Sequence, residues 1–332
     1  MKREAKPEDP IESHMRIVDP HHHLWGDRPD RPIAPRYYLE ELRLDTNSGH
    51  YIDKTVFIEC GESYHESGPE AFAVVGETER MVIEAERSRK TAGAYIAGIV
   101  SSADFRLPVE TIAEVLAAHE AAGQGLFRGI RHRLAFDPTG AARSSKEEPN
   151  TEGLMGQDIF RANLAQLGAR GHSFEAWLYH PQMPELVELA KTAPGTTIIL
   201  NHIGAPLGVG TYAGRRDEIH ALWRDRIVEL SQLPNVMVKL GGVGMAPYGS
   251  GWAERGKVAT SDEIVDAWGP AMHHIIKHFG TKRCMFESNF PVDKVSFSYR
   301  TMWNAYKKMT QGMPTAERED LFALTAERVY RI

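Results

Sequence analysis

The stretch of sequence that decides the fold is Val18-Asp-Pro-His-His-His-Leu-Trp25. It continues the short apolar run Met15-Arg-Ile-Val18, which predicts a buried β-strand. Side chains on a strand alternate between its two faces, so four of them are expected on one side: Asp19, His21, His23 and Trp25. The pattern therefore predicts two imidazoles that converge where a strand ends.

The pair His21 and His23 is a candidate metal site, because imidazole is the commonest protein ligand for zinc-like ions. Asp19, two residues earlier, is suited to hydrogen-bond one of these ligands and fix its tautomer. The alternative is a solvated histidine run in a loop, with His22 no different from its neighbours. The chain has 2 cysteines, which are too few for a cysteine zinc site. The position of the histidines directly after the first strand favours the metal site.

Seven further runs rich in aliphatic or β-branched residues follow, at residues 54–60, 95–101, 126–132, 173–179, 196–202, 235–240 and 283–289. Stretches with helical spacing lie between them, at residues 69–91, 109–122, 184–192, 217–232, 264–279 and 315–329. Strands that alternate in this way with helices predict a single (β/α)8 TIM barrel of the α/β class. No Gly-x-Gly-x-x-Gly follows the first strand, which disfavours a dinucleotide-binding fold.

The chain is expected to divide into a charged extension, residues 1–14, and the barrel, residues 15–332. The formal net charge is −6, which gives no reason to expect nucleic acid or an anionic membrane as a partner. The first residues lack an apolar signal segment, and no apolar run is long enough to span a bilayer. We therefore expect a soluble, cytoplasmic protein.

The carboxyl ends of the predicted strands, where barrels place their active sites, carry many polar side chains. These are His21, His23, Glu59, Arg128, Arg131, His132, His180, His202, Lys239, Glu287, Asn289 and Asp293. A single ionisable group at such an end is often a paired core residue, so the inference depends on the whole set. Long polar or glycine-rich connections at residues 137–157, 204–214 and 241–261 are expected to form the walls of a pocket, although the first is equally typical of surface disorder.

At these positions the chain resembles the amidohydrolase superfamily, in particular the amidohydrolase-2 group that contains sugar-lactone and pyrone-dicarboxylate lactonases. The resemblance lies in six segments: Asp19-x-His21-x-His23-x-Trp25, Phe127-Arg-Gly-Ile-Arg131, Pro181-Gln-Met-Pro184, Leu200-Asn-His202-Ile-Gly204, Val238-Lys-Leu-Gly241 and Arg283-Cys-Met-Phe-Glu-Ser-Asn-Phe-Pro291. They follow the family's order over nearly the whole chain. They are more specific for the fold than for the reaction.

The resemblance implies one divalent metal ion held by histidines, namely His21, His23, His202 and His180. Zinc is the expected ion, with manganese or iron as alternatives, and some lactonases of this group work without metal. Related two-metal enzymes carry a lysine at the end of strand four, which this chain lacks. Three residues are expected to bind the substrate, two of them through its negative charge: Arg131, Lys239 and Trp25.

The eighth strand departs from the family pattern. The lactonases end this strand in Gly-Ser-Asp, whose aspartate is a general base or a metal ligand, whereas this chain has Glu287-Ser288-Asn289. An amide does not ionise, so Asn289 cannot take a proton from water. Three explanations stay open: Glu287 replaces the base from a position roughly 6.6 Å deeper along the strand, Asp293 folds back over the pocket, or the chemistry needs no such base.

The leading hypothesis is a metal-dependent hydrolase that opens a lactone or a similar carbonyl compound with metal-activated water, with Glu287 or Asp293 moving the proton. The alternative is a non-oxidative decarboxylase or an iron- or manganese-dependent oxygenase on the same scaffold. A third hypothesis is a barrel that binds a ligand without catalysis, because Asn289 has replaced the base. The expected partner is a small-molecule substrate that bears a carboxylate, and a homo-oligomer is common for such enzymes.

Overall fold

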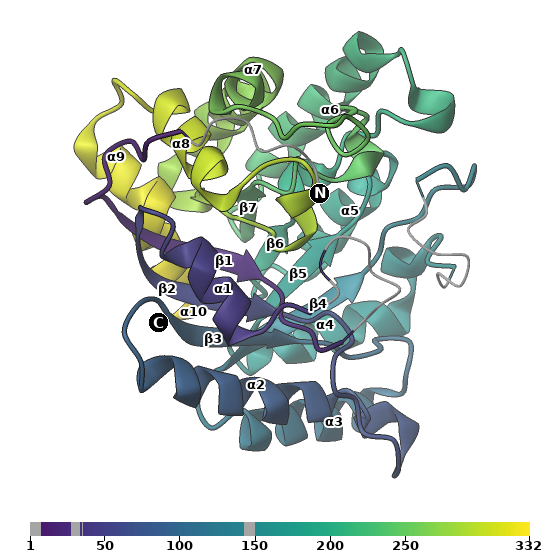
Figure 1. Cartoon of the computed structure of the whole chain (residues 1–332). Helices are drawn as coiled ribbons and strands as arrows, with labels where there is room; N and C mark the ends of the chain where they lie inside the picture. The colour runs from purple at the N-terminus through teal and green to yellow at the C-terminus, as the bar shows by residue number, and fades with distance from the viewer. Residues whose placement is uncertain (1–7, 28–33, 35, 143–149) are drawn as a thin grey trace.

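The computed structural model describes residues 8–27, 34, 36–142 and 150–332. In these residues eight parallel strands form one sheet, in the order β1 to β8. Their bounds are Arg16–His22 (β1), Tyr51–Ile58 (β2), Tyr95–Ser101 (β3), Phe127–Arg133 (β4), Ser173–Trp177 (β5), Ile198–Leu200 (β6), Val236–Leu240 (β7) and Cys284–Phe286 (β8). The eight predicted strands are therefore confirmed, and they lie in the middle of the molecule (Figure 1).

Residues just beyond β8 bring the sheet nearly to closure. Phe290 forms a parallel bridge with His22, and its carbonyl accepts a hydrogen bond of 2.8 Å from the backbone N–H of His23. The backbone N–H of Asn289 donates to the carbonyl of His21 at 2.9 Å. Because these contacts join the end of β8 to the end of β1, the sheet has the form of the predicted (β/α)8 barrel.

The helices of the described residues alternate with the strands and cover the sheet from outside (Figure 1). Their bounds are Leu39–Thr46 (α1), Val75–Arg89 (α2), Val109–Ala122 (α3), Asp158–Ala169 (α4), Met183–Thr192 (α5), Arg216–Ser231 (α6), Ser261–Phe279 (α7), Tyr299–Met309 (α8), Thr315–Glu319 (α9) and Thr325–Tyr330 (α10). The six predicted helices are present with shifted ends, the last one divided into α9, a π-helical turn and α10. The helices α1, α4 and α8 were not predicted.

Apolar packing closes the barrel at the end opposite to the polar strand ends. Inward-facing strand residues such as Val56, Ile58 and Ile199 form one buried cluster with Tyr330 of α10. Burying an aliphatic side chain of this size contributes about 1.5–3 kcal/mol. The inside of the barrel is therefore divided along its axis, with a dry core on one side and a polar centre at the carboxyl ends of the strands.

The alternation expected for the first strand is interrupted at Pro20. The register of β1 against β2 shifts between Asp19 and His22. The carboxylate of Asp19 accepts from the backbone N–H groups of His21 at 3.3 Å and Ser288 at 3.0 Å and from the hydroxyl of Tyr299 at 2.9 Å, and from no imidazole ring in the described part of the chain. The expectation that Asp19 fixes the tautomer of a neighbouring histidine is therefore wrong.

The three long connections follow β4, β6 and β7, as expected. Residues 143–149 of the first connection, and residues 1–7 of the predicted charged extension, lie outside the described residues. The next part of that extension contacts the barrel helices, because the carboxylate of Glu8 accepts from the backbone N–H of Ser261 at 2.7 Å. In the described ranges we find no helix with the length and apolar character needed to cross a membrane.

Candidate metal centre at the carboxyl ends of the strands

Four residues that the sequence singled out meet inside the carboxyl end of the barrel, at or just beyond β1, β6 and β8: His21, His23, His202 and Glu287. All four side chains are buried. Burial lowers the pKa of each of the three imidazoles well below its usual value, so these rings are neutral. Neutral imidazole is the form that binds metal ions.

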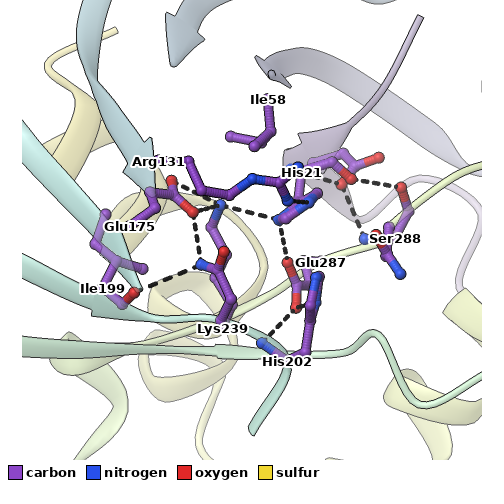
Figure 2. A network of polar contacts seen from close by, with 12 residues as sticks. His21, Ile58, Arg131, Glu175, Ile199, His202, Lys239, Glu287 and Ser288 are labelled. Atoms are coloured by element: carbon purple, nitrogen blue, oxygen red, sulfur yellow. Dashed lines mark hydrogen bonds and ion pairs between the residues drawn. The ribbon is translucent and has the colours of Figure 1, made fainter. Parts of the chain in front are cut away.

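Glu287 lies between two of the histidines, as Figure 2 shows. Its Oε2 is 2.7 Å from Nδ1 of His21, and its Oε1 is 2.7 Å from Nδ1 of His202. The contact with His202 is a hydrogen bond in which Nδ1 donates to the carboxylate. The equally close approach of Oε2 to Nδ1 of His21 is favourable only with a proton on that nitrogen, so we assign the Nδ1 proton there as well. The second nitrogen of each ring, Nε2, is then left with a lone pair. Burial raises the pKa of Glu287, and the ammonium group of Lys239 acts in the opposite direction.

His23 presents a lone pair toward His21 for a different reason. Nδ1 of His23 lies 2.9 Å from the carbonyl of Ile58, which can only accept, so Nδ1 carries the proton. Its Nε2 lies 3.3 Å from Nε2 of His21 and 3.3 Å from Oδ1 of Asn289. Both neighbours of this nitrogen are acceptor atoms. The lone pairs of His21 Nε2, His23 Nε2 and Asn289 Oδ1 therefore converge in a buried space.

These distances discriminate between two donor sets that share His21. Atoms bound to one ion at the usual length of about 2.0–2.1 Å lie roughly 3.3–3.4 Å apart in a tetrahedral arrangement. Nε2 of His23 has this spacing from Nε2 of His21 and from Oδ1 of Asn289. A second set, formed by His21, His202 and Glu287 within 4.8 Å of one another, contains contacts of 2.7 Å. We interpret the second set as hydrogen bonds that orient the imidazoles, and the first as the set that fits a divalent cation.

Asn289 is held at both ends of its side chain. Its Nδ2 donates to Oδ1 of Asp293 at 2.8 Å, which leaves Oδ1 of the amide facing His23. The other carboxylate oxygen of Asp293 accepts from the backbone N–H of Gly244 at 2.9 Å. Burial raises the pKa of Asp293, and the two N–H donors act in the opposite direction. Asp293 thus lies behind Asn289 rather than over the centre.

Two arginines of β4 share one carboxylate at the edge of the centre. Nε of Arg131 donates to Oε1 of Glu59 at 2.7 Å, its Nη2 donates to the carbonyl of Glu59 at 2.6 Å, and its Nη1 lies 3.3 Å from Nε2 of His21. Arg133, two residues further on the same face, contacts Glu59 at 3.3 and 3.4 Å and keeps 55% of its side chain exposed. Burial alone raises the pKa of Glu59, but the charges of Arg133 and Arg131 outweigh it and hold the pKa at about 2. Arg133 was not singled out in the sequence.

Lys239 forms a buried ion pair below the histidines. Its Nζ lies 2.8 and 2.6 Å from the two carboxylate oxygens of Glu175 and 3.2 Å from Nδ1 of His21 (Figure 2). Since Nδ1 of His21 has the shorter contact with Glu287, Glu175 is the principal partner of the ammonium group. Asn201 and Tyr330 also donate to Glu175. Burial lowers the pKa of Lys239, while Glu175 raises it.

Two other residues from the sequence prediction lie away from the converging lone pairs. In the described part of the chain, Nδ1 of His180 accepts from the backbone N–H of Leu207 at 3.2 Å, and its ring lies 5.5 Å from that of Tyr212. Trp25 is buried, stacks on His23 with ring centroids 6.4 Å apart, and donates to the carbonyl of Ala34 at 2.7 Å. Their predicted roles as metal ligand and substrate ligand stay predictions.

A cavity of about 400 Å³ lies outside the barrel, beside α6 and α7. It is lined by residues that include Arg216, Tyr248, Trp252 and Trp268, and by none of the histidines of the centre. The hydroxyl of Tyr248, at the edge of this cavity, donates to the carbonyl of His202 at 2.6 Å.

A (β/α)8 barrel with a buried histidine centre at the carboxyl ends of its strands is typical of metal-dependent barrel hydrolases. The family model described as Amidohydrolase matches residues 18–332, and the chain therefore belongs to this amidohydrolase family. The resemblance inferred from the sequence is confirmed.

The relatives include proteins of known and unknown activity. The uncharacterized protein y4mH of Sinorhizobium fredii is 32% identical over 338 residues, which cover 96% of this chain and 100% of the relative. An L-fucono-1,5-lactonase of Burkholderia multivorans is 26% identical over 240 residues, 72% of this chain and 73% of the relative. A crystal structure of an amidohydrolase from Burkholderia multivorans with bound zinc has 22% identity and a TM-score of 0.72, and the match covers 96% of this chain and 100% of that one. At this identity the structure supports the fold alone.

Proposed function

We propose that this protein is a metal-dependent hydrolase that opens a lactone or a similar carbonyl compound at the carboxyl end of its barrel. The observation that carries the proposal is the position of His23 Nε2, which lies 3.3 Å from two other acceptor atoms in a buried space. A buried lone pair surrounded by acceptors is unfavourable unless a positive charge lies between them. A divalent cation provides that charge.

His21 and His23 would hold the ion in this proposal, and His202, which the sequence predicted as a further ligand, is assigned to proton transfer instead. A divalent ion held there would supply Lewis-acid chemistry, that is, it would polarise a carbonyl and activate water. Zinc is the first candidate, because the donors are imidazole nitrogens and oxygen, with manganese and iron next. His180 lies further out and is not needed for this set.

His202 and Glu287 move the proton. In the proposed reaction the oxygen of a water molecule bonds to the lactone carbonyl carbon, and His202 takes the water proton at Nε2. Glu287 holds the Nδ1 proton of the same ring at 2.7 Å and stabilises the resulting imidazolium. The bond between the carbonyl carbon and the ring oxygen then breaks, and His202 returns the proton to that oxygen. The product is a hydroxy acid.

Arg133 is the residue that we propose to bind a carboxylate of the substrate. The guanidinium of Arg131 is engaged by Glu59 and His21, whereas Arg133 has longer contacts with Glu59 and a half-exposed side chain. A guanidinium matches a carboxylate with two parallel hydrogen bonds. The proposed substrate is therefore a lactone that bears a carboxylate.

The L-fucono-1,5-lactonase relative supports lactone opening as the reaction, because it is 26% identical over 72% of this chain. The amide at Asn289 is the observation that favours the decarboxylase or oxygenase as a second candidate. These reactions do not need the carboxylate base that the lactonases carry there. A lactonase releases acid, whereas a decarboxylase releases CO₂ and an oxygenase consumes oxygen.

The test is a panel of five- and six-membered lactones, neutral and carboxylate-bearing, offered to the protein loaded with Zn²⁺ or Mn²⁺. Acid release in a weakly buffered solution measures ring opening. The His202→Ala variant is expected to lose turnover, and His278→Ala, on the outer helix α7, serves as the matched control. Failure of the loaded protein to open any lactone, together with CO₂ release from an aromatic acid or with oxygen uptake, would overturn the hydrolase proposal.

A further inference from the structure

Asn289 has a role of its own in the metal centre. We propose that its amide oxygen Oδ1 is an inner ligand of the ion, and that Asp293 is a positioning residue that keeps this oxygen, rather than the amide nitrogen, turned toward it. The inference depends on the metal ion of the proposed function but not on the reaction. It differs from the expectation that Asp293 moves a proton.

The first support is distance. Oδ1 of Asn289 lies 3.3 Å from Nε2 of His23, which equals the separation of the two Nε2 atoms of His23 and His21. An amide oxygen is an acceptor, and so is Nε2 of His23, so this contact is not a hydrogen bond. Both atoms are instead spaced as two ligands of one ion are spaced.

The second support is the backbone of Asn289. Its φ is 54°, in the left-handed region that asparagine and aspartate tolerate better than most other residues. Its N–H donates to the carbonyl of His21 at 2.9 Å, so the residue is fixed to the strand that carries both histidines. The side chain therefore starts from a defined point beside the two Nε2 atoms.

The third support is the contact behind the amide. The two ends of an amide have nearly the same shape, so only hydrogen bonding decides which end faces the ion. Oδ1 of Asp293 accepts from Nδ2 of Asn289 at 2.8 Å, and its Oδ2 accepts from Gly244 N–H at 2.9 Å. Both oxygens of Asp293 accept in this arrangement, so a flipped amide would place its own oxygen against an accepting oxygen and an N–H₂ against the ion. Both changes are unfavourable.

A neutral third ligand has an energetic consequence. The donors of His21, His23 and Asn289 are all uncharged, and Nη1 of Arg131 lies 3.3 Å from Nε2 of His21. A carboxylate in place of the amide adds one negative charge next to the cation, in a site shielded from water. The natural centre should therefore bind a divalent ion more weakly than one in which the carboxylate and the amide have exchanged places.

The experiment measures Zn²⁺ affinity of the metal-free protein by competition with a chromogenic chelator, without substrate. Asp293→Asn leaves one acceptor oxygen for two donors, Nδ2 of Asn289 and the N–H of Gly244, and is expected to weaken Zn²⁺ binding about 10- to 100-fold. The double variant Asn289→Asp/Asp293→Asn exchanges the two groups. Its introduced amide can donate to the introduced carboxylate, whose two oxygens are equivalent, so its affinity should equal or exceed that of the natural protein. Asp262→Asn, at an exposed pair on α7, is the control and should bind as the natural protein does.

The visible absorption of bound Co²⁺ reports whether an inner ligand has changed. We expect it to differ between the natural protein and the double variant, and urea unfolding of the metal-free proteins shows that each variant is folded. Unchanged Zn²⁺ affinity in Asp293→Asn and in Asn289→Ala, with loss in His23→Ala, would overturn this inference and leave the proposed metal centre intact. Absence of Zn²⁺ binding by the natural protein would contradict the proposed function itself.

Discussion

Oε2 of Glu287 lies 2.7 Å from Nδ1 of His21, and both side chains are completely buried. The other oxygen of the same carboxylate makes an equal contact with His202. One acidic residue thus fixes the tautomers of two histidines that come from strands on different sides of the barrel. This is the task that the sequence had suggested for Asp19, and it accounts for a glutamate two residues before Asn289.

Replacing this carboxylate should loosen the metal centre. In the Glu287→Gln variant one acceptor becomes an N–H₂ group that faces a ring N–H, so one imidazole loses its orientation. We expect Zn²⁺ affinity to fall about 10- to 100-fold, as for other partners that orient metal ligands. Chelator competition at pH 7 measures the change, and an affinity within a factor of two of the natural protein would refute the orienting role.

Arg133 should determine the preference for charged substrates. A hydrogen bond to a charged group contributes about 1.5–3 kcal/mol, so Arg133→Met should raise the KM for a carboxylate-bearing lactone roughly 10- to 100-fold. The kcat should change little, and a neutral lactone should be unaffected. Arg170→Met, at a partly exposed pair with Glu120, is the matched control. An equal loss with charged and neutral lactones would show that Arg133 acts on stability or on the chemical step instead.

The ion pair of Lys239 and Glu175 should matter for stability. Both side chains are completely buried, and breaking such a pair by removing one partner costs about 3–5 kcal/mol. We expect Glu175→Gln to lower the free energy of unfolding by this amount. Glu188→Gln, at a pair with Lys191 in which both side chains are about half exposed, should cost less than about 1 kcal/mol. Urea denaturation compares the two, and similar values would contradict the account of the barrel interior.

Glu77 should make stability depend on pH. It accepts from the backbone N–H groups of Cys60 and Glu62, at 2.9 and 2.8 Å, and burial raises its pKa from 4.5 to about 7. A carboxyl whose pKa is raised by folding binds its proton more tightly in the folded state. Its contribution to stability is therefore complete below pH 4.5 and is lost as the pH rises through about 7.

The Glu77→Gln variant cannot lose this contribution. The free energy of unfolding of the natural protein should fall relative to the variant by up to about 3 kcal/mol between pH 4.5 and 7, since one pKa unit corresponds to about 1.4 kcal/mol. Urea denaturation of both proteins at several pH values gives the difference. A difference that does not change with pH, or that grows in the opposite direction, is incompatible with a buried carboxyl of raised pKa.

The sequence predicted the barrel and most of the centre because both depend on local periodicity. Apolar runs predicted the eight strands, and the polar residues at the ends of these strands included His21, His202, Lys239 and Glu287. Three helices escaped prediction: α1, α4 and α8. The last contains three aromatic residues, Tyr299, Trp303 and Tyr306, whose intrinsic helix propensity is low. Burial against the strands stabilises this helix instead.

Pairings between strands could not be predicted from local patterns. The register of β1 against β2 shifts between Asp19 and His22, and no spacing rule signals this irregularity. Glu175 lies within β5, and only the arrangement of strands brings it to Lys239. Arg133 could have been predicted from the sequence, since residues two apart on a strand share a face and Arg131 had already been singled out.

The central claim is that His23 and its neighbours hold a divalent ion, and elemental analysis tests it most directly. The protein is purified without added metal or chelator, beside the His23→Ala and His278→Ala variants. We predict about one equivalent of zinc, manganese or iron in the natural protein and in His278→Ala, and a loss of nearly all of it in His23→Ala. Equal metal content in His23→Ala and the natural protein, or no metal in any of the three even after incubation with Zn²⁺, would contradict the account.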